Sequence, residues 1–411
     1  MLKLADKQYF LQDIPLFELV HKYGAPLYIY DAEKMKAQYD RLCQAFASLH
    51  CQIKYACKAL TNLSILKLFE SWGAGLDTVS WEEVQLGLLA GFAPHKIIFT
   101  PNSISFEELQ QAVAQRIVVN IDNLMILEQF GRFYGGSVPC CIRFNPNLLA
   151  GGNWHIQTGH SASKFGIPLD QLVKVVEIVK THKIDVSGIH AHSGSDIGAS
   201  DTFYEEAELL YKAAYQFPNL KFVDFGGGLK VAYHQDDKAT DIERLADKLG
   251  EGFRRFCTIY GREVEIWFEP GKFLVSEAGY LLVKANVVKD NGNVTFVGVD
   301  SGLNHLIRPM LYNAYHKVIN LSNTAGMPKI YDIVGYICET DTLAQDRILF
   351  EVRPGDLLCF FNAGAYGFSM SSNYNSRLRP AEVLILNHKD YLIRRRETLD
   401  DLIRNQVILD L

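Results

Sequence analysis

The feature that most constrains the fold is a regular alternation of apolar, β-prone runs with stretches of helical periodicity. Eight β-prone runs lie at residues 52–57, 74–79, 96–100, 117–121, 138–144, 186–191, 220–225 and 264–268. Helical patterns fall between them, for example at 80–90, 105–115 and 201–217. Eight strand-and-helix positions within about 240 residues match the size of a (β/α)8 barrel, whereas a doubly wound sheet usually has fewer strands. The sequence therefore predicts a parallel (β/α)8 (TIM) barrel.

Past residue 275 the pattern changes to β-prone segments without intervening helices. These segments lie at 280–288, 294–299, 317–320, 329–334, 356–361 and 381–387. Runs of this kind build an antiparallel β-barrel or sandwich. We therefore expect a lead-in strand region at 1–27 that pairs with the C-terminal β domain, a barrel domain at 28–275, and an all-β domain at 276–411.

Composition argues against several classes of partner. A net charge of −6 gives no basic field for nucleic acid. The first residues carry charges where a signal peptide needs an apolar core, and no run approaches the roughly 18 apolar residues of a membrane span. The eight cysteines show neither a CxxC pair nor metal-ligand spacing, so we expect reduced thiols and no metal site. These features predict a cytoplasmic protein that does not associate with membranes.

Polar residues and glycines follow most of the predicted barrel strands, where the active sites of such barrels lie. They are Lys58, Asp77, Arg143, His190, His192, Ser195, Gly226, Gly227, Gly228 and Glu269. Each has an ordinary explanation when taken alone. A lysine at a strand end usually extends its amine into water, a lone histidine is usually satisfied within the fold, and a glycine triplet is usually a tight connection.

Taken together, these residues supply the parts that pyridoxal 5'-phosphate requires. The amine of Lys58 can form a Schiff base, and backbone N–H groups of Gly226–Gly228 can surround a phosphate because no Cβ blocks the approach. The flat imidazole of His192 can stack on the ring. The carboxylate of Glu269 can keep the pyridine nitrogen protonated, which makes the ring an electron sink. The sequence therefore predicts a pyridoxal 5'-phosphate site.

The chain also resembles the alanine-racemase-fold pyridoxal-phosphate decarboxylases, and among them most closely the diaminopimelate decarboxylase family. The matching stretches are Tyr55-Ala-Cys-Lys-Ala, Gly75-Leu-Asp-Thr-Val-Ser, Arg143-Phe-Asn-Pro, Ser163-Lys-Phe-Gly, His190-Ala-His-Ser-Gly-Ser, Gly226-Gly-Gly, Glu269-Pro-Gly, Arg308-Pro-Met-Leu-Tyr, Cys338-Glu and residues 363–377. They cover essentially the whole chain, and the long match at 363–377 is the most specific.

The resemblance implies a role for each matching residue toward the cofactor. Lys58 would hold it covalently, His192 would stack on its ring, and Glu269 would pair with its nitrogen. Its phosphate would be bound by Ser195, by Gly226, Gly227 and Gly228, and by Tyr366. Asp77 and Arg143 would be further cofactor contacts.

The resemblance also implies the substrate and the assembly. The reaction would be decarboxylation of meso-2,6-diaminopimelate to L-lysine and CO2, the last step of lysine biosynthesis. Substrate would be bound by Lys272, Arg308, Tyr312, Glu339 and Tyr366, with Arg308 and Tyr312 on its distal carboxylate and Glu339 on its distal ammonium. Cys338 would donate a proton after CO2 leaves. Cys338 and Glu339 would come from the neighbouring subunit, so a head-to-tail homodimer with two shared sites is expected.

Two departures from the family pattern concern substrate and phosphate contacts. Lys272 stands where the family usually has arginine, which keeps the charge but removes the two-pronged geometry. Asn362 stands where the family usually has aspartate, so a charge is missing near Tyr366. A third region, Leu148 to Ala162, is rich in glycine and contains Trp154, and we expect it to form a loop over the barrel mouth.

Three other functions stay open at this point. A related decarboxylase could act on carboxynorspermidine, ornithine or arginine, although ornithine and arginine would leave Arg308 without a carboxylate, and a buried unpaired arginine is costly. A non-catalytic pyridoxal-phosphate-binding protein would consist of the barrel alone. A metal-dependent barrel hydrolase could use His190, His192 and Asp77.

Overall fold

The computed structural model describes residues 2–148, 151, 158–198, 200–234 and 236–411. Most of the loop expected from Leu148 to Ala162, including Trp154, lies outside the described residues. The chain divides into two compact units. Unit 1 comprises Met1–Ala37, Tyr233–Asp237 and Leu274–Leu411, and unit 2 comprises Gln38–Ala232 and Lys238–Phe273.

Unit 2 is a closed barrel of eight parallel strands, which confirms the predicted barrel. The strands are β5 (Cys51–Ala56), β6 (Gly75–Thr78), β7 (Ile97–Phe99), β8 (Val118–Ile121), β9 (Pro139–Asn145), β11 (Asp185–Ala191), β12 (Phe222–Asp224) and β13 (Glu265–Phe268). Each pairs in parallel with the next, and the pairing of β13 with β5 closes the ring. The short strand β10 (Ile167–Pro168) adds to β9. Closure brings the carboxyl ends of all eight strands to one end of the barrel.

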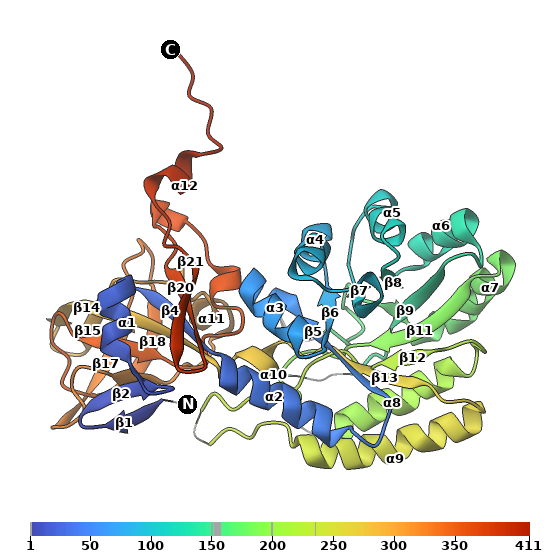
Figure 1. Ribbon diagram of the computed structural model, residues 1–411, viewed down its shortest axis with the longest axis horizontal. Helices are drawn as coiled ribbons and strands as arrows, with labels where there is room; N and C mark the ends of the chain where they lie inside the picture. The colour runs from blue at the N-terminus through green and yellow to red at the C-terminus, as the bar shows by residue number, and fades with distance from the viewer. Residues whose placement is uncertain (1, 149–150, 152–157, 199, 235) are drawn as a thin grey trace. The chain divides into compact units, whose positions relative to one another are not determined.

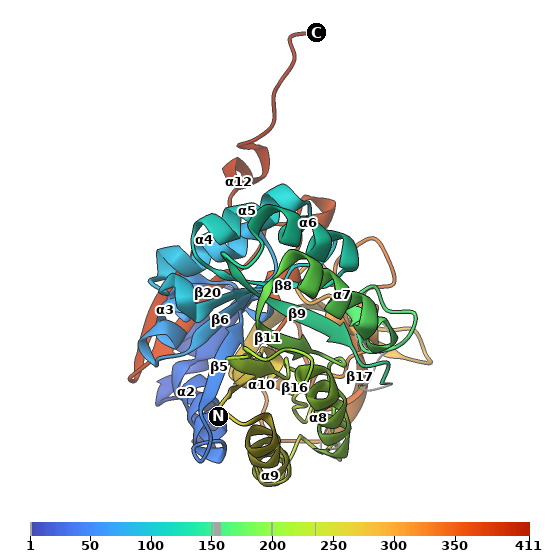
Figure 2. The same cartoon turned by 90° about the vertical axis from the view of Figure 1, so that its right-hand side faces the viewer.

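Helices surround the strands of unit 2, as Figure 2 shows. They are α3 (Leu63–Ser71), α4 (Trp81–Ala90), α5 (Phe106–Ala114), α6 (Leu124–Tyr134), α7 (Leu172–His182), α8 (Ser200–Ala214) and α9 (Ile242–Tyr260). Local sequence fixes their starts, because an Asn, Ser or Asp side chain accepts a backbone N–H at the first turn of several of them. Ser80 caps α4 in this way, and Asp241 caps α9. Two further helices, α2 (Ala32–Ala45) and α10 (Lys272–Val275), contain points where the chain passes between the units.

Unit 1 is a mixed sheet domain (Figure 1). Its strands are β4 (Leu27–Asp31), β14 (Gly279–Asp290), β15 (Thr295–Val299), β16 (Val318–Asn320), β17 (Pro328–Val334), β18 (Thr342–Phe350), β19 (Leu357–Phe360), β20 (Ala381–Leu386) and β21 (Lys389–Arg394). Two of the pairings, β4 with β20 and β15 with β17, are parallel. The expectation of an antiparallel architecture is therefore corrected to a mixed one. Apolar periodicity predicts that a segment is a strand but carries no information on the direction of its neighbours.

The N-terminal region differs from its predicted arrangement. The strands β1 (Lys3–Ala5), β2 (Gln8–Leu11) and β3 (Ile14–Pro15) pair with one another in a separate three-stranded sheet. They are followed by α1 (Leu16–Tyr23), and the region joins the core of unit 1 through buried apolar side chains such as Leu11 and Leu16. The strand that enters the large sheet is β4, between β14 and β20. Residues 28–37 thus belong to unit 1, whereas the sequence placed them with the barrel.

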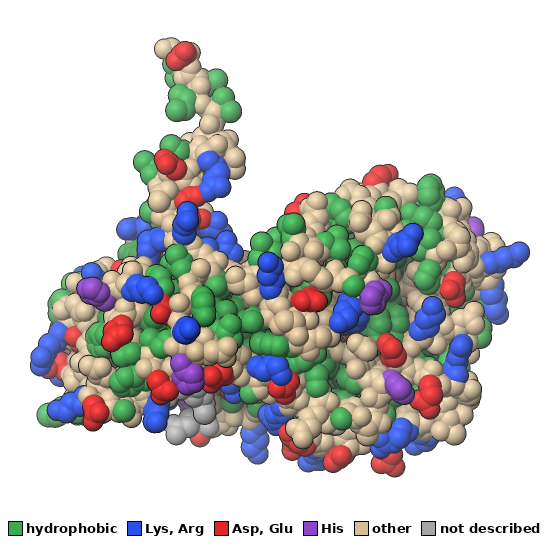
Figure 3. Space-filling view, in the orientation of Figure 1, with side chains coloured by type: hydrophobic (Ala, Val, Ile, Leu, Met, Phe, Trp, Pro, Cys, Tyr) green, Lys and Arg blue, Asp and Glu red, His purple; other side chains and the backbone are tan. Residues whose placement is uncertain are grey.

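Unit 1 also contains two short helices, α11 (Arg308–Tyr312) between β15 and β16 and α12 (Leu399–Ile403) near the C-terminus. Beyond α12 the apolar side chains of Val407, Ile408 and Leu409 are exposed. Figure 3 shows hydrophobic side chains, in green, along the terminal segment. None of the helices in the described part of the chain has both the length and the apolar character that a membrane span requires.

Candidate active site

The barrel places Lys58 beside Asp77 at neighbouring strand ends. Lys58 lies in a short 3-10 turn (Cys57–Ala59) directly after β5, and Asp77 lies in β6. The Nζ of Lys58 is 2.6 Å from Oδ2 of Asp77, which is fully buried, while 38% of the lysine side chain is exposed. Burial and the charge of Glu269 raise the pKa of Asp77 to about 7, although Lys58 opposes the shift. Lys58 is thus accessible and has a proton acceptor in contact with its amine.

Glu269 follows β13 and is held by a buried histidine. The Nε2 of His190, the penultimate residue of β11, lies 3.1 Å from Oε2 of Glu269, and both side chains are buried. Thr100 Oγ1 donates a longer hydrogen bond of 3.4 Å to Oε1. Burial alone would raise the pKa of Glu269, but the hydrogen-bonded His190 and the charge of Lys58 lower it to about 2. Glu269 is therefore an ionised carboxylate inside the barrel.

Asp224, the last residue of β12, takes the opposite protonation state. Burial first, and then the charge of Glu269, raise its pKa well above the ordinary range, because two adjacent buried carboxyl groups cannot both ionise. Its Oδ1 accepts a hydrogen bond of 2.8 Å from the backbone N–H of Gly226. His190, Asp224 and Glu269 offer possible metal-ligand atoms within 4.8 Å of one another, a different group from the predicted alternative of His190, His192 and Asp77.

The glycine triplet after β12 is packed so closely that side chains cannot be added. Gly226 and Gly228 have φ of 60° and 95°, which L side chains rarely adopt. A Cβ at Gly227 would lie 2.5 Å from the carbonyl oxygen of Glu269, and one at Gly226 would lie 2.8 Å from Cβ of His192. The N–H of Gly227 faces Nδ1 of His192 at 3.3 Å. These contacts require glycine at all three positions, and this triplet, the glycine cradle, lies against the imidazole ring of His192.

His192 and Arg143 complete the polar residues of the barrel interior. Desolvation, with the charges of Arg143 and His190 next, lowers the pKa of His192 well below its ordinary value, so its ring is neutral. Arg143 lies buried in β9 with its guanidinium 4.9 Å from the ring centroid of Phe165. It forms no ion pair with any residue that the structure describes. Its charge is offset at a distance by Glu269 and Asp122.

Unit 1 brings together other predicted residues. Arg308 begins α11 and is buried, with its guanidinium carbon 5.4 Å from the ring centroid of Tyr233 and 5.7 Å from that of Tyr312. The buried Nε of Arg308 has no hydrogen-bond partner in the described part of the chain. An arginine held in this way has donor capacity left for a ligand carboxylate.

Cys338 and Glu339 lie together on the surface of unit 1. Asn375 Nδ2 donates to Cys338 Sγ at 3.2 Å, and the hydroxyl of Tyr374 donates to Oε1 of Glu339 at 2.7 Å. Both contacts come from the predicted 363–377 motif. Tyr366 of the same motif has a left-handed backbone with φ of 57°. The assigned roles of these residues stay predictions.

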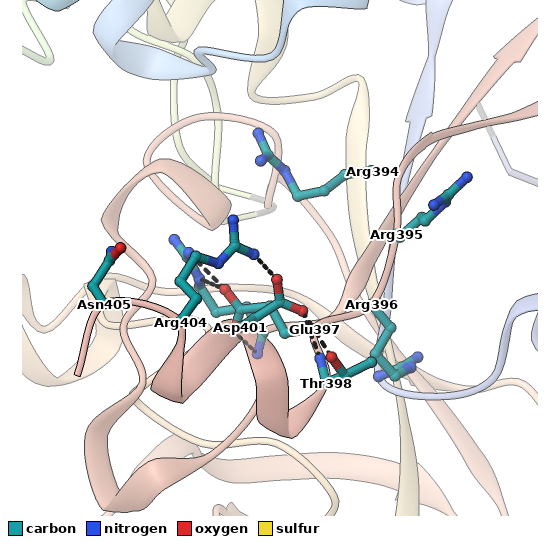
Figure 4. A pocket seen from close by; sticks show the side chains of 9 residues that line it. Arg394, Arg395, Arg396, Glu397, Thr398, Asp401, Arg404 and Asn405 are labelled. Carbon is teal, nitrogen blue, oxygen red and sulfur yellow. Dashed lines mark hydrogen bonds and ion pairs between the residues drawn. The ribbon is translucent and has the colours of Figure 1, made fainter. Parts of the chain in front are cut away.

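A separate cavity of about 810 Å³ in unit 1 is lined by arginines and is shown in Figure 4. Its lining residues are Arg379, Arg394, Arg395, Arg396, Glu397, Thr398, Asp401, Arg404 and Asn405. Arg379 pairs with Glu397 at 2.6 Å, Arg404 pairs with Asp401, and Arg394 pairs with Glu382. Because the predicted site residues are absent from this lining, the cavity is not a candidate for the active site.

The sequence prediction missed the partners that control Glu269. His190 stood among the strand-end residues but received a role only in the metal-hydrolase alternative, and Asp224 and Thr100 received none. Strand alternation offered one signal for Asp224. Residues two apart in a strand point to the same face, so Phe222 and Asp224 share one face of β12. The division of protons between Asp224 and Glu269 depends on burial and distance, which no sequence pattern reports.

The closed barrel, its strand-end lysine, the glycine cradle and the buried carboxylate define a barrel protein built for pyridoxal phosphate. A family model described as "Pyridoxal-dependent decarboxylase, pyridoxal binding domain" matches residues 32–276. The chain belongs to this family of pyridoxal-dependent decarboxylases.

Relatives similar over nearly their full length carry one name. The chain is 37% identical to "Diaminopimelate decarboxylase" of Methanothermobacter thermautotrophicus, over 95% of this chain and 93% of the relative. It is 36% identical to the protein of that name from Aquifex aeolicus, over 97% and 96%. A solved diaminopimelate decarboxylase from M. jannaschii in complex with L-lysine has a TM-score of 0.91 and 31% identity, and the match covers 100% of this chain and 98% of that one.

One further acid, Glu206, lies in α8 and contacts the loop that follows β11. It is buried and accepts a hydrogen bond from the hydroxyl of Ser193, three residues before Asp196. Its other oxygen, Oε1, has no hydrogen-bond partner among the described residues. Burial raises its pKa from 4.5 to about 7, with Ser193 and Arg143 acting in the opposite direction.

We expect Glu206→Gln to flatten the pH dependence of stability. The pKa of Glu206 is higher in the folded protein than in the unfolded chain. The protonated carboxyl therefore makes its full contribution to stability below pH 4.5, and the wild type loses this contribution as pH rises through 7. Ionising the buried group fully costs roughly 3 kcal/mol, at about 1.4 kcal/mol for each pKa unit. Between pH 5 and 8, the thermal midpoint of the variant relative to that of the wild type should rise with pH. An equal pH slope in both proteins would contradict this role of Glu206.

Proposed function

We propose that the protein decarboxylates meso-2,6-diaminopimelate to L-lysine and CO2, the last step of lysine biosynthesis, with pyridoxal 5'-phosphate as cofactor. The observation that carries the choice of substrate is the buried guanidinium of Arg308, whose Nε lacks a partner in the described chain. A substrate with a distal carboxylate would satisfy it, whereas ornithine or arginine would not. The names of the relatives support the same reaction. The solved lysine/ornithine decarboxylase from Vibrio vulnificus is 22% identical and shares the fold only.

In this proposal the residues of unit 2 hold the cofactor. When bound, the cofactor's protonated ring withdraws electrons from the carbon that loses CO2. Lys58 would anchor it, Ser195 and Gly226–Gly228 would hold its phosphate, and His192 would stack on its ring. Tyr366 of unit 1 would be a further phosphate contact. Asp77, with a pKa of about 7 and in contact with Lys58 Nζ, can take up and return the proton of that amine.

Glu269 and its partners set the charge at the ring nitrogen. Because Glu269 is ionised, it would stabilise a proton on the ring nitrogen of the cofactor. His190 fixes the carboxylate by a hydrogen bond, and the protonated Asp224 leaves Glu269 as the ionised member of the carboxyl pair. Arg143 adds a buried cation that offsets the carboxylates of the interior.

The substrate's far end would be held by residues of unit 1. Arg308 and Tyr312 would bind the distal carboxylate, and Glu339 would bind the distal ammonium. Cys338 would supply the proton that replaces CO2, and we propose that Cys338 and Glu339 act in the site of the neighbouring subunit of a homodimer. Their exposure on the surface of unit 1 supports this role, because side chains that serve another subunit must be accessible.

We also propose that the protein works in the cytoplasm. The described cysteines form no disulfide, and five of the eight are buried. Reduced thiols fit a reducing compartment.

Lys58→Ala should abolish turnover and the visible absorbance of the covalently held cofactor. The fold should persist, because Lys58 lies at a strand end and not in the core. The measurement is an absorption spectrum before and after borohydride reduction, with Lys67→Ala, an exposed lysine of α3, as the matched control. A reducible adduct that survives in Lys58→Ala would assign the anchor to another lysine.

Arg308→Lys should lower kcat/KM for meso-diaminopimelate by roughly 30- to 1000-fold. A lost charge-assisted, two-pronged contact costs roughly 2–4 kcal/mol, and each 1.4 kcal/mol is tenfold. The cofactor spectrum should not change. Arg353→Lys, at an exposed arginine of the same unit, serves as the control variant, and ornithine serves as the control substrate. Undiminished turnover of diaminopimelate, or a wild type that prefers ornithine, would show that the substrate lies among the family's other amines.

Mixed subunits test the shared site. Lys58→Ala and Cys338→Ala homodimers should each be inactive, whereas a heterodimer formed from them should contain one intact site. Activity after subunit exchange should therefore approach about half of the wild-type value for each heterodimer. If exchange is demonstrated by differently tagged subunits and no activity returns, Cys338 serves the site of its own chain.

A further inference from the structure

Lys272, which replaces the family's usual arginine, is paired with a specific carboxylate inside unit 2. It directly follows the Glu269-Pro-Gly turn and begins α10. Its Nζ lies 2.8 Å from both Oδ1 and Oδ2 of Asp196. Only 7% of the lysine side chain and 19% of the aspartate side chain are exposed. Two of the three donor positions of the ammonium are therefore directed at one carboxylate.

Asp196 is itself held in an unusual backbone conformation. Its φ is 64°, in the left-handed region that residues other than glycine rarely adopt. The next residue, Ile197, donates its N–H to the carbonyl of Gly228 at 2.9 Å and forms a bridge with Leu229. The carbonyl of Ile197 accepts a hydrogen bond of 2.7 Å from Thr240 Oγ1. Asp196 thus lies between Ser195 and a segment that is bonded to the last glycine of the cradle.

The ion pair connects two strand ends that both border the cradle. Ser195 and Asp196 belong to the loop after β11, whereas Lys272 follows β13, and the N–H of Glu269 donates to the carbonyl of Gly226 at 2.7 Å. Breaking the pair by removing one partner would leave an unpaired, largely buried charge. Replacing both partners by neutral residues would not leave such a charge.

We propose that Asp196 is a positioning residue for the cofactor's phosphate. Through its ion pair with Lys272 it fixes Ser195 and the glycine cradle at a constant separation, and this fixes the affinity for a phosphoryl group. Lys272 accordingly acts through Asp196 and is not a ligand of the substrate, in contrast to its predicted role. The proposal rests on the proposed function only in that the cradle binds pyridoxal 5'-phosphate.

The test compares cofactor retention in holoenzyme variants by following visible absorbance after dilution into a cofactor trap. We expect Asp196→Asn and Lys272→Met each to raise the cofactor dissociation constant by about tenfold, and the double variant to lose no more than either single one, because partners in one ion pair are not additive. Lys272→Arg keeps the positive charge and should retain the cofactor as well as the wild type does. The affinity for pyridoxal, which lacks the phosphoryl group, should be the same in all variants.

Several results would overturn the proposal. Retention that is unchanged in both single variants, or losses that multiply in the double variant, would show that the pair does not position the cradle. Tighter cofactor binding in Asp196→Asn would show that Asp196 competes with the phosphate for Lys272. An equal loss of pyridoxal affinity would indicate a general folding defect, and a rise in the substrate KM with full cofactor retention would return Lys272 to the substrate. A wild type that binds no pyridoxal 5'-phosphate would instead defeat the proposed function.

Discussion

The site depends on one buried ionised carboxylate, that of Glu269. A carboxylate in a barrel interior is costly unless hydrogen bonds and nearby cations stabilise it, and here His190 supplies the hydrogen bond while Lys58 supplies a cation. The neighbouring acids adjust to this charge. Asp224 stays protonated, and the pKa of Asp77 rises to about 7 beside the amine of Lys58. One interior therefore contains an acid that is charged at neutral pH, one that is neutral, and one that titrates near neutrality, a combination that suits proton transfer.

Much of this arrangement was predictable from the sequence because barrel topology converts sequence position into spatial position. Any polar residue that follows a barrel strand faces the same end of the barrel, so Lys58, Asp77 and the glycine cradle could be grouped before their distances were known. The close packing of Arg308 with Tyr312 follows from their spacing on one short helix. The eight barrel strands were found because each coincides with a β-prone run that alternates with helical periodicity.

Other features depend on contacts between distant segments, which local patterns do not encode. The strands β18 and β21 were missed because many of their residues are exposed and polar. The insertion of β4 between β14 and β20 joins segments separated by about 250 and 350 residues, and nothing in its own five residues indicates those neighbours. The partner of Lys272 was equally hidden, because Asp196 reads as one more polar loop residue. The φ of 54° at Asn362 is one that both asparagine and the family's usual aspartate tolerate.

The position of β4 has a consequence for how the protein is made. Unit 1 is discontinuous in sequence, because β4 must pair on both sides with strands that are translated after the whole barrel. During synthesis the N-terminal segment therefore emerges without its partners, and all eight strands of the barrel become available first. The barrel is in effect an insertion between the strands of another domain. The pairing of β4 can be completed only after β20 has been synthesised, so the sheet of unit 1 is assembled last although its first strand is made first.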